Sequence, residues 1–153
     1  MSAVVTNLVD MMNGAMEQTI PPAHRMGIKA VEARRGYAAA TVPLEGNGNH
    51  FGVMYAGVQF TVAEILGGII TIASFDAAKY YPLVKKVDIQ FTGMARSDLR
   101  AEASLDEEEI GRIEAEAAEK GKADFTLDAV VKDQDDQTVS VTHGLYQLRA
   151  HGT

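Results

Sequence analysis

The chain has 153 residues, of which 46% are hydrophobic, so it can bury one core of ordinary size but not the cores of two domains. Its 14 basic and 21 acidic residues give a formal net charge of -7, which argues against the broad cationic surface that nucleic acid or anionic lipid would require. The sequence contains no cysteine, which excludes disulfides, thiolate metal ligands and a cysteine nucleophile. We therefore expect one domain over residues 1–153.

The N-terminal segment predicts a helix rather than a targeting signal. It lacks a basic start, and Asp10, Asn13 and Glu17 interrupt its apolar residues, so we expect no signal peptide and a cytoplasmic location. Apolar residues recur at helical spacing from about residue 2 to residue 18. The pair Pro21-Pro22 follows, which predicts that an amphipathic opening helix ends before it.

Two strands are expected after this helix, over about residues 26–34 and 37–44. Arg35-Gly36 suits a tight turn between them, and Pro43 closes the second strand. This pattern predicts a hairpin.

A long apolar run over residues 58–75 contains one formal charge, Glu64. The length is close to the roughly 20 residues that a bilayer requires. However, polar residues and glycines are dispersed through the run, and no basic cluster flanks its start. We expect a buried central helix over about residues 57–76 and no membrane partner.

The second half of the chain alternates polar and apolar residues, as half-buried strands do. Strands are expected around residues 86–91, 99–105, 125–131 and 139–148. Asp106 and Glu109 form a capping-box pattern, and Gly121 provides a stop, which together predict a surface helix. A polar turn over residues 133–137 joins the last two strands. On the last strand, His143 shares a face with Val139 and Val141 and is expected to be an interior group.

Clean alternation favours an antiparallel sheet with one wet face and one covered face. The central helix is the one predicted element apolar enough to cover that face. The expected fold class is therefore α+β, with an antiparallel sheet wrapped around a long central helix.

The segment before the central helix carries the candidate chemistry. It runs Asn49-His50-Phe51-Gly52-Val53-Met54-Tyr55-Ala56-Gly57, and Glu64 follows seven residues after Gly57. This run resembles the N-x-x-G-x-x-H-G-G-x(6)-D/E signature of hotdog-fold acyl-CoA thioesterases of the phenylacetyl-CoA thioesterase type. The spacing matches without a gap, and the element order matches over nearly the whole chain. Tyr55 stands where the family usually has histidine, and Ala56 stands where it has the first glycine. This version looks like that of a branch of hotdog domains whose activity is poorly defined.

The resemblance implies hydrolysis of an acyl-CoA or acyl carrier thioester. Gly57 would polarise the thioester carbonyl at the helix N-terminus, where free N–H groups and the helix dipole favour negative charge. Glu64 would be the general base or a carboxylate nucleophile, and Asn49 would orient the water or the carbonyl. Burial among apolar neighbours should raise the pKa of Glu64, which suits a base that works near neutral pH.

The spacing of these residues predicts a shared site. Gly57 and Glu64 lie seven residues apart, about 10 Å along a helix, which is too far to flank one carbonyl carbon. In the hotdog family, paired subunits place the turn of one chain opposite the helix carboxylate of the other. A homodimer, or a homotetramer of two such pairs, is implied.

Further substrate contacts are candidates. Tyr55 would form a pocket wall, Gly52 would permit the turn, and His50 would lie at the pocket rim. Arg96 and Ser97 lie where hotdog enzymes often bind coenzyme A phosphates, and a guanidinium could pair with a phosphate. No metal or cofactor is expected, because the chain has neither cysteine nor a His–Glu pair at helical spacing.

Each candidate also has a structural explanation. Glu64 could cap backbone groups or form an ion pair across a dimer interface. Asn49 could satisfy loop backbone, and Gly52 and Gly57 could serve only the turn and the helix start. A noncatalytic hotdog domain that binds acyl-CoA or another apolar ligand is therefore the alternative function. A hotdog dehydratase or isomerase would need a histidine base in the turn, and His50 is offset from that position.

Overall fold

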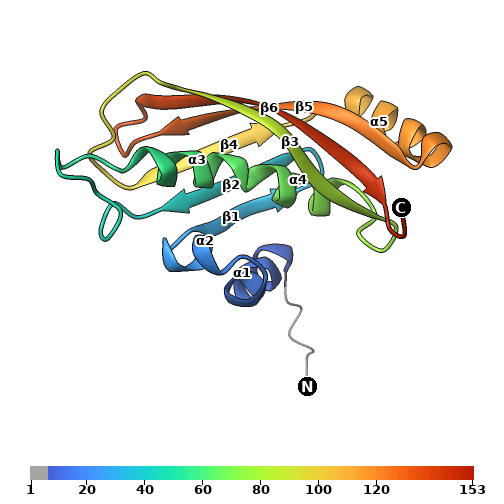
Figure 1. The fold of residues 1–153 in the computed structure, drawn as a ribbon, viewed down its shortest axis with the longest axis horizontal. Helices are drawn as coiled ribbons and strands as arrows, with labels where there is room; N and C mark the ends of the chain where they lie inside the picture. The colour runs from blue at the N-terminus through green and yellow to red at the C-terminus, as the bar shows by residue number, and fades with distance from the viewer. Residues whose placement is uncertain (1–6) are drawn as a thin grey trace.

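A curved antiparallel sheet wraps around one long, interrupted helix (Figure 1). The computed structural model describes residues 7–153. The strands are β1 (Lys29–Arg34), β2 (Tyr37–Val42), β3 (Tyr80–Phe91), β4 (Leu99–Ser104), β5 (Lys122–Lys132) and β6 (Thr138–Ala150). The helices are α1 (Leu8–Thr19), α2 (Pro21–Arg25), α3 (Ala56–Glu64), α4 (Leu66–Ser74) and α5 (Glu107–Lys120). The sheet order is β1-β2-β4-β5-β6-β3, and every pairing is antiparallel. The predicted α+β hotdog arrangement is confirmed.

Small residues line the sheet beneath the central helix. Ala38 and Ala40 of β2 lie opposite Ala103 and Ala101 of β4, and all four are buried. Because their side chains end at a methyl group, the helix backbone can lie close to the sheet. Along β5 the buried and exposed residues alternate as predicted. The hairpin of β1 and β2 turns at Arg35-Gly36, and this prediction is also confirmed.

The face of β6 that points inward is not the predicted one. Thr142 and Tyr146 are buried and pair with Ala129 and Phe125 of β5, whereas His143 is exposed. The His143 Nδ1 atom lies 2.5 Å from an Asp128 carboxylate oxygen on the outer face. The expectation of an interior His143 is therefore wrong. The hydrophobic pattern did not identify this inward face of β6, because the face carries small or polar residues beside the large ring of Tyr146.

The central helix is interrupted at Ile65, which separates α3 from α4. The hydroxyl of Tyr146 donates to the carbonyl oxygen of Glu64 at 3.3 Å, and the N–H of Gly68 donates instead to Ile65 at 3.1 Å. A side chain inserted into the hydrogen-bond ladder is a recognised cause of a helix break.

Residues 56–74 are long and apolar enough to cross a bilayer by length and composition alone, and 56% of that window is buried within this fold.

The N-terminal helix begins later than predicted. Asn7 caps α1 by accepting a hydrogen bond from the N–H of Asp10 at 2.8 Å, and residues 2–6 of the predicted helix lie outside the described residues. Pro21 and Pro22 do follow the end of α1, but they begin α2, because proline suits the first turn of a helix. The Asn13 side chain then fastens α1 to β1 through two 2.8 Å hydrogen bonds with Ala30.

The remaining predicted turns and caps are confirmed. Asp106 caps α5 through the N–H of Glu109 at 2.7 Å, and Gly121 ends the helix in the left-handed conformation at φ 78°. Strand β3 begins at Tyr80, six residues before its predicted start, and lies at the edge of the sheet.

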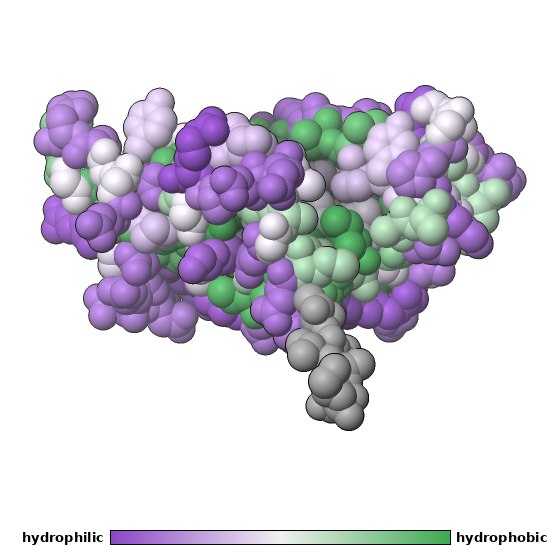
Figure 2. All heavy atoms as spheres, turned by 90° about the horizontal axis from the view of Figure 1, so that it is seen from below, coloured by the Kyte–Doolittle hydropathy of each residue, from purple (hydrophilic) through white to green (hydrophobic). Residues whose placement is uncertain are grey.

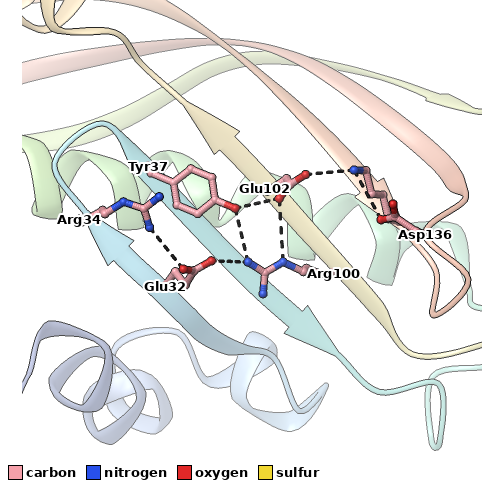
Figure 3. A network of polar contacts seen from close by, with 7 residues as sticks. Glu32, Arg34, Tyr37, Arg100, Glu102 and Asp136 are labelled. Atoms are coloured by element: carbon pink, nitrogen blue, oxygen red, sulfur yellow. Dashed lines mark hydrogen bonds and ion pairs between the residues drawn. The ribbon is translucent and has the colours of Figure 1, made fainter.

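A network of charged and polar groups crosses the outer face of the sheet, opposite the central helix (Figure 3). It joins Glu32 and Arg34 of β1, Tyr37 of β2, Arg100 and Glu102 of β4, Lys132 of β5 and Asp136 of the following turn. Each charge in it meets an opposite charge. Each exposed ion pair of this kind contributes little to the free energy of unfolding. We therefore infer that the network helps to fix the order of the strands and has no catalytic role.

Candidate functional site

The motif segment forms a tight turn held by Asn49. The N–H of Asn49 donates to the carbonyl of Val53 at 2.7 Å, and its side-chain oxygen accepts from the N–H groups of Phe51 and Val53 at 2.9 and 3.3 Å. Gly52 has φ 78°, a conformation that glycine adopts readily. The spacing of Asn49 and Gly52 is therefore the spacing that this turn requires.

Buried polar groups fasten the turn to the fold. The side-chain nitrogen of Asn47 donates to the backbone carbonyls of Met26 and Pro43 at 2.7 and 2.8 Å. The backbone carbonyl of Asn47 accepts from the backbone N–H of Tyr55 at 2.9 Å. Gln59 donates to the Met54 carbonyl at 3.0 Å. Asn47 was not among the predicted residues, although its place between two glycines is a signal for a turn residue.

The start of α3 presents free backbone donors. Its first hydrogen bonds come from the N–H groups of Val58 and Gln59, which donate to the Tyr55 carbonyl at 3.0 and 3.2 Å. The N–H groups of Ala56 and Gly57 precede these bonds and lie outside the helical ladder. The Tyr55 ring is 59% exposed and lies against Gly57, where an added Cβ would be 2.7 Å from the ring. Because Gly57 has no side chain, the Tyr55 ring can lie against the first turn of α3.

Glu64 lies on the one stripe of the central helix that the sheet does not fully bury. At intervals of three or four residues this stripe contains Gly57, Thr61, Glu64, Gly68 and Ile72. Glu64 is half-buried, and burial raises the pKa of its carboxyl group. In the part of the chain that the structure describes, no basic side chain shifts this pKa. Among residues 7–153 of one chain, the suggested cap by the Glu64 carboxylate is not seen. The suggested ion pair across a dimer interface stays a prediction.

Tyr146 is the second titratable group in this region. Burial raises its pKa first, and the nearby charge of Glu64 raises it further. Its ring is stacked on Phe125 at 5.8 Å between ring centres, and it fills the space that Gly67 and Gly144 leave. No signal in the motif predicted this neighbour, because it lies 82 residues from Glu64 in the sequence.

The other predicted contacts surround the turn. His50 is exposed and its ring lies 3.9 Å from that of Phe51, while Arg96 is exposed. A 2.8 Å hydrogen bond from the Met54 N–H to the Ala95 carbonyl holds the segment that carries Arg96 beside the motif turn. Ser97 accepts from the N–H of Gln134 at 3.0 Å and donates to the Asp98 carbonyl at 2.9 Å, so its hydroxyl joins two loops.

The structure thus brings Asn49, Gly52, Tyr55 and Gly57 together and leaves Glu64 at the far end of α3. Seven residues of helix separate Gly57 from Glu64 by about 10 Å. One end of α3 offers backbone donors for an anion, and the other offers a carboxylate with a raised pKa. Within a single chain, the two groups therefore lie too far apart to contact one reacting carbon atom.

Comparison with solved structures places this fold among proteins named thioesterases. A protein of unknown function from Pseudomonas aeruginosa, described as a probable thioesterase, is 40% identical over 93% of this chain and 95% of that one, with a TM-score of 0.86. A thioesterase from Haemophilus influenzae has the same fold, with 14% identity over 97% and 96% of the two chains and a TM-score of 0.76.

A third neighbour is a thioesterase from Staphylococcus aureus, with 15% identity over 84% of this chain and 98% of that one. Two variants of it have been solved, with TM-scores of 0.70 and 0.69. One variant has a glutamine replaced by alanine and the other a glutamate, fifteen positions apart in that chain.

A search of curated proteins finds no match. A family model described as a domain of unknown function, DUF4442, matches residues 5–147. Because this match spans most of the sequence, the chain belongs to the DUF4442 family.

Proposed function

We propose that this protein hydrolyses thioesters of coenzyme A or of an acyl carrier, at sites shared between two copies of the chain. Glu64 carries the proposal. It is a carboxylate on the accessible stripe of an otherwise apolar helix, and burial raises its pKa toward the range in which a general base works. In the proposed reaction, Glu64 takes a proton from water as the water attacks the thioester carbonyl. The tetrahedral intermediate then collapses, the C–S bond breaks, and the departing thiolate takes the proton back from Glu64 to leave as a thiol, with the carboxylic acid as the other product.

The N-terminus of α3 supplies the complementary group. As the carbonyl carbon becomes tetrahedral, its oxygen gains negative charge, which free N–H groups and the helix dipole stabilise. The N–H of Gly57 is the proposed donor. The Asn49 side chain uses its oxygen to hold the turn, so its nitrogen is the atom left to orient the water or the carbonyl.

A spacing in the Staphylococcus aureus protein supports Asn49 and Glu64 as a pair. The glutamine and glutamate that were replaced there are fifteen positions apart, and fifteen positions separate Asn49 from Glu64. In this chain, residues at this spacing place Asn49 in the turn and Glu64 at the end of α3.

The edge strand supports the pairing of two copies. β3 is twelve residues long and, among the described residues, has a neighbouring strand on one side only, so one row of its N–H and C=O groups is available to pair. Leu83, Val84 and Phe91 on this strand are 39%, 48% and 49% exposed. A second chain aligned along β3 would cover them and would bring the turn of one chain toward Glu64 of the other.

The decisive experiment is steady-state hydrolysis of a panel of acyl-CoAs by the wild type and by Glu64→Gln. Removal of a general base should reduce turnover by about a hundredfold or more while binding is retained. Glu119→Gln, the same change at an exposed position on α5, is the matched control and should keep full activity. Undiminished turnover in Glu64→Gln would refute the assignment. Binding without hydrolysis in the wild type would instead identify a noncatalytic acyl-CoA-binding domain.

Mixed dimers test whether the site is shared. Inactive Glu64→Gln and Asn49→Ala chains should regain part of the wild-type activity when combined, because one of the two sites then has both intact groups. Verified heterodimers that stay inactive would contradict a shared site.

A further inference from the structure

An apolar groove lies between α1 and α4 and has a volume of about 340 Å³. Met11, Met12 and Met16 line it from α1, and Gly68, Ile69 and Ile72 line it from α4. Thr19 is its one polar side chain among the described residues. Figure 2 looks onto this side of the molecule and shows apolar residues gathered near its middle. The groove is in the size range of small-molecule sites.

The groove continues the stripe that carries the proposed base. Gly68 and Ile72 lie four and eight residues after Glu64, so they follow it along one side of the helix. Ile65, the residue after Glu64, also lines the groove. The lining on the central helix therefore begins one residue after Glu64, which does not itself line the groove, and reaches Ile72.

The α1 wall of the groove is held in place by hydrogen bonds, and its lining side chains are flexible. The two hydrogen bonds between Asn13 and Ala30 hold α1 against β1 at a fixed position. Methionine side chains are flexible and polarizable, and they adapt to apolar ligands of varied shape. Met11, Ile20 and Ile72 are 55%, 42% and 40% exposed, so a ligand in the groove would cover large apolar side chains.

We propose that this groove binds the alkyl chain of the acyl group, with the thioester carbonyl beside Glu64 and the chain running over Gly68 toward Ile72. This inference rests on the proposed thioesterase function. Eight helical residues from Glu64 to Ile72 span about 12 Å. With C–C bonds of about 1.5 Å at tetrahedral angles, this length fits an extended chain of about ten carbons. The preferred substrates are therefore unbranched, medium-chain acyl thioesters.

Gly68 sets the depth of the groove. An added Cβ at this residue meets no atom within 4 Å, whereas at Gly67 it would lie 2.1 Å from the buried Tyr146 ring. A larger side chain at position 68 can therefore fill the groove without displacing the core. Gly68→Leu is the variant that blocks the chain and leaves Glu64 and Gly57 in place.

The test measures calorimetric binding of S-alkyl-CoA thioethers, which have no carbonyl and are not hydrolysed, with chains of four, eight, ten and twelve carbons. Wild-type affinity should rise by up to about fourfold per methylene and level off near ten carbons. Gly68→Leu should weaken S-decyl-CoA binding by about thirtyfold or more and S-butyl-CoA binding by no more than about twofold. Gly111→Leu, on exposed α5 with open space above it, is the control and should bind like the wild type.

A second variant covers the case in which Gly68→Leu does not fold. Ile72→Lys changes a side chain that is 40% exposed, so the fold should tolerate it, and its charge should selectively weaken binding of the longer chains. Equal wild-type affinity for S-butyl-CoA and S-decyl-CoA would overturn the proposal. Dissociation of an oligomer by Gly68→Leu, with unchanged S-decyl-CoA affinity, would also overturn it and would make a second copy the occupant.

Hydrolysis measured on the same proteins separates this inference from the proposed function. If the wild type hydrolyses acyl-CoAs and Gly68→Leu leaves the chain-length profile unchanged, the groove proposal fails and the thioesterase function stands. If the wild type hydrolyses none of them and S-decyl-CoA binding still depends on position 68, the function fails and the alkyl site stands.

Discussion

Gly67 and Gly68 are neighbours in α4, yet alanine should have opposite effects on stability at the two positions. At Gly67 the new Cβ would lie 2.1, 2.6 and 2.7 Å from three atoms of the Tyr146 ring. That ring is 3% exposed and stacks on Phe125, so it has little room to move. At Gly68 the new methyl group would meet no atom within 4 Å.

The magnitudes follow from two opposing effects. Overpacking in a well-packed core costs about 1–3 kcal/mol. Replacing a helical glycine by alanine gains about 0.5–1 kcal/mol. Because the clash at Gly67 involves a confined ring, we expect Gly67→Ala to lose about 2 kcal/mol of unfolding free energy. Gly68→Ala has no clash and should gain about 0.5–1 kcal/mol.

The assay is thermal unfolding followed by circular dichroism at one protomer concentration, since pairing of subunits would make Tm depend on concentration. For a chain of about 150 residues, the expected shifts are a fall of roughly 4–8 °C for Gly67→Ala and a rise of roughly 1–4 °C for Gly68→Ala. A Tm for Gly67→Ala equal to or above that of Gly68→Ala would refute the packing argument.

Three further predictions concern charge and assembly. Burial raises the pKa of Glu64 above its ordinary 4.5, so this group contributes stability below that pH and loses it as the pH rises through the raised pKa. Urea titrations from about pH 4 to about pH 8 should therefore show Glu64→Gln gaining stability relative to the wild type, and a constant difference would contradict the shift. Arg96→Ala should raise KM about tenfold for acyl-CoA but leave it unchanged for the matching N-acetylcysteamine thioester, which lacks the phosphates; equal effects on both would exclude a phosphate contact. If two copies pair along β3 as proposed, Val84→Lys on this edge strand should dissociate them in sedimentation experiments, whereas Lys79→Ala, at an exposed position before β3, should not.

Local signals predicted most of the fold. The alternation of β5, the cap of α5 and the turn between β1 and β2 depend on residues that are close in sequence, and all three are confirmed. The start of β3 was missed because an edge strand exposed on both faces does not alternate. α2 was missed because a proline pair can begin a helix as well as follow one.

Long-range contacts explain what the sequence did not reveal about the site. The spacing of Asn49, Gly52 and Gly57 located the turn and the helix start, because both are local structures. The break at Ile65 depends on Tyr146, which is distant in the sequence, and the groove depends on the docking of α1 through Asn13. Neither partner could be identified from the motif alone.

The motif departs from the hotdog thioesterase signature at the side chains of Tyr55 and Ala56, whereas the proposed oxyanion donors are backbone groups. Ala56 is exposed, so its methyl group occupies no space inside the fold, and its N–H remains outside the helical ladder as a glycine N–H would. Tyr55 changes more, because its ring lies against Gly57 at the helix start. The ring lies beside the proposed donors and does not remove them. Under the proposed function, the departure is therefore expected to alter which substrates reach the helix N-terminus, and it leaves intact the groups that would stabilise the developing charge.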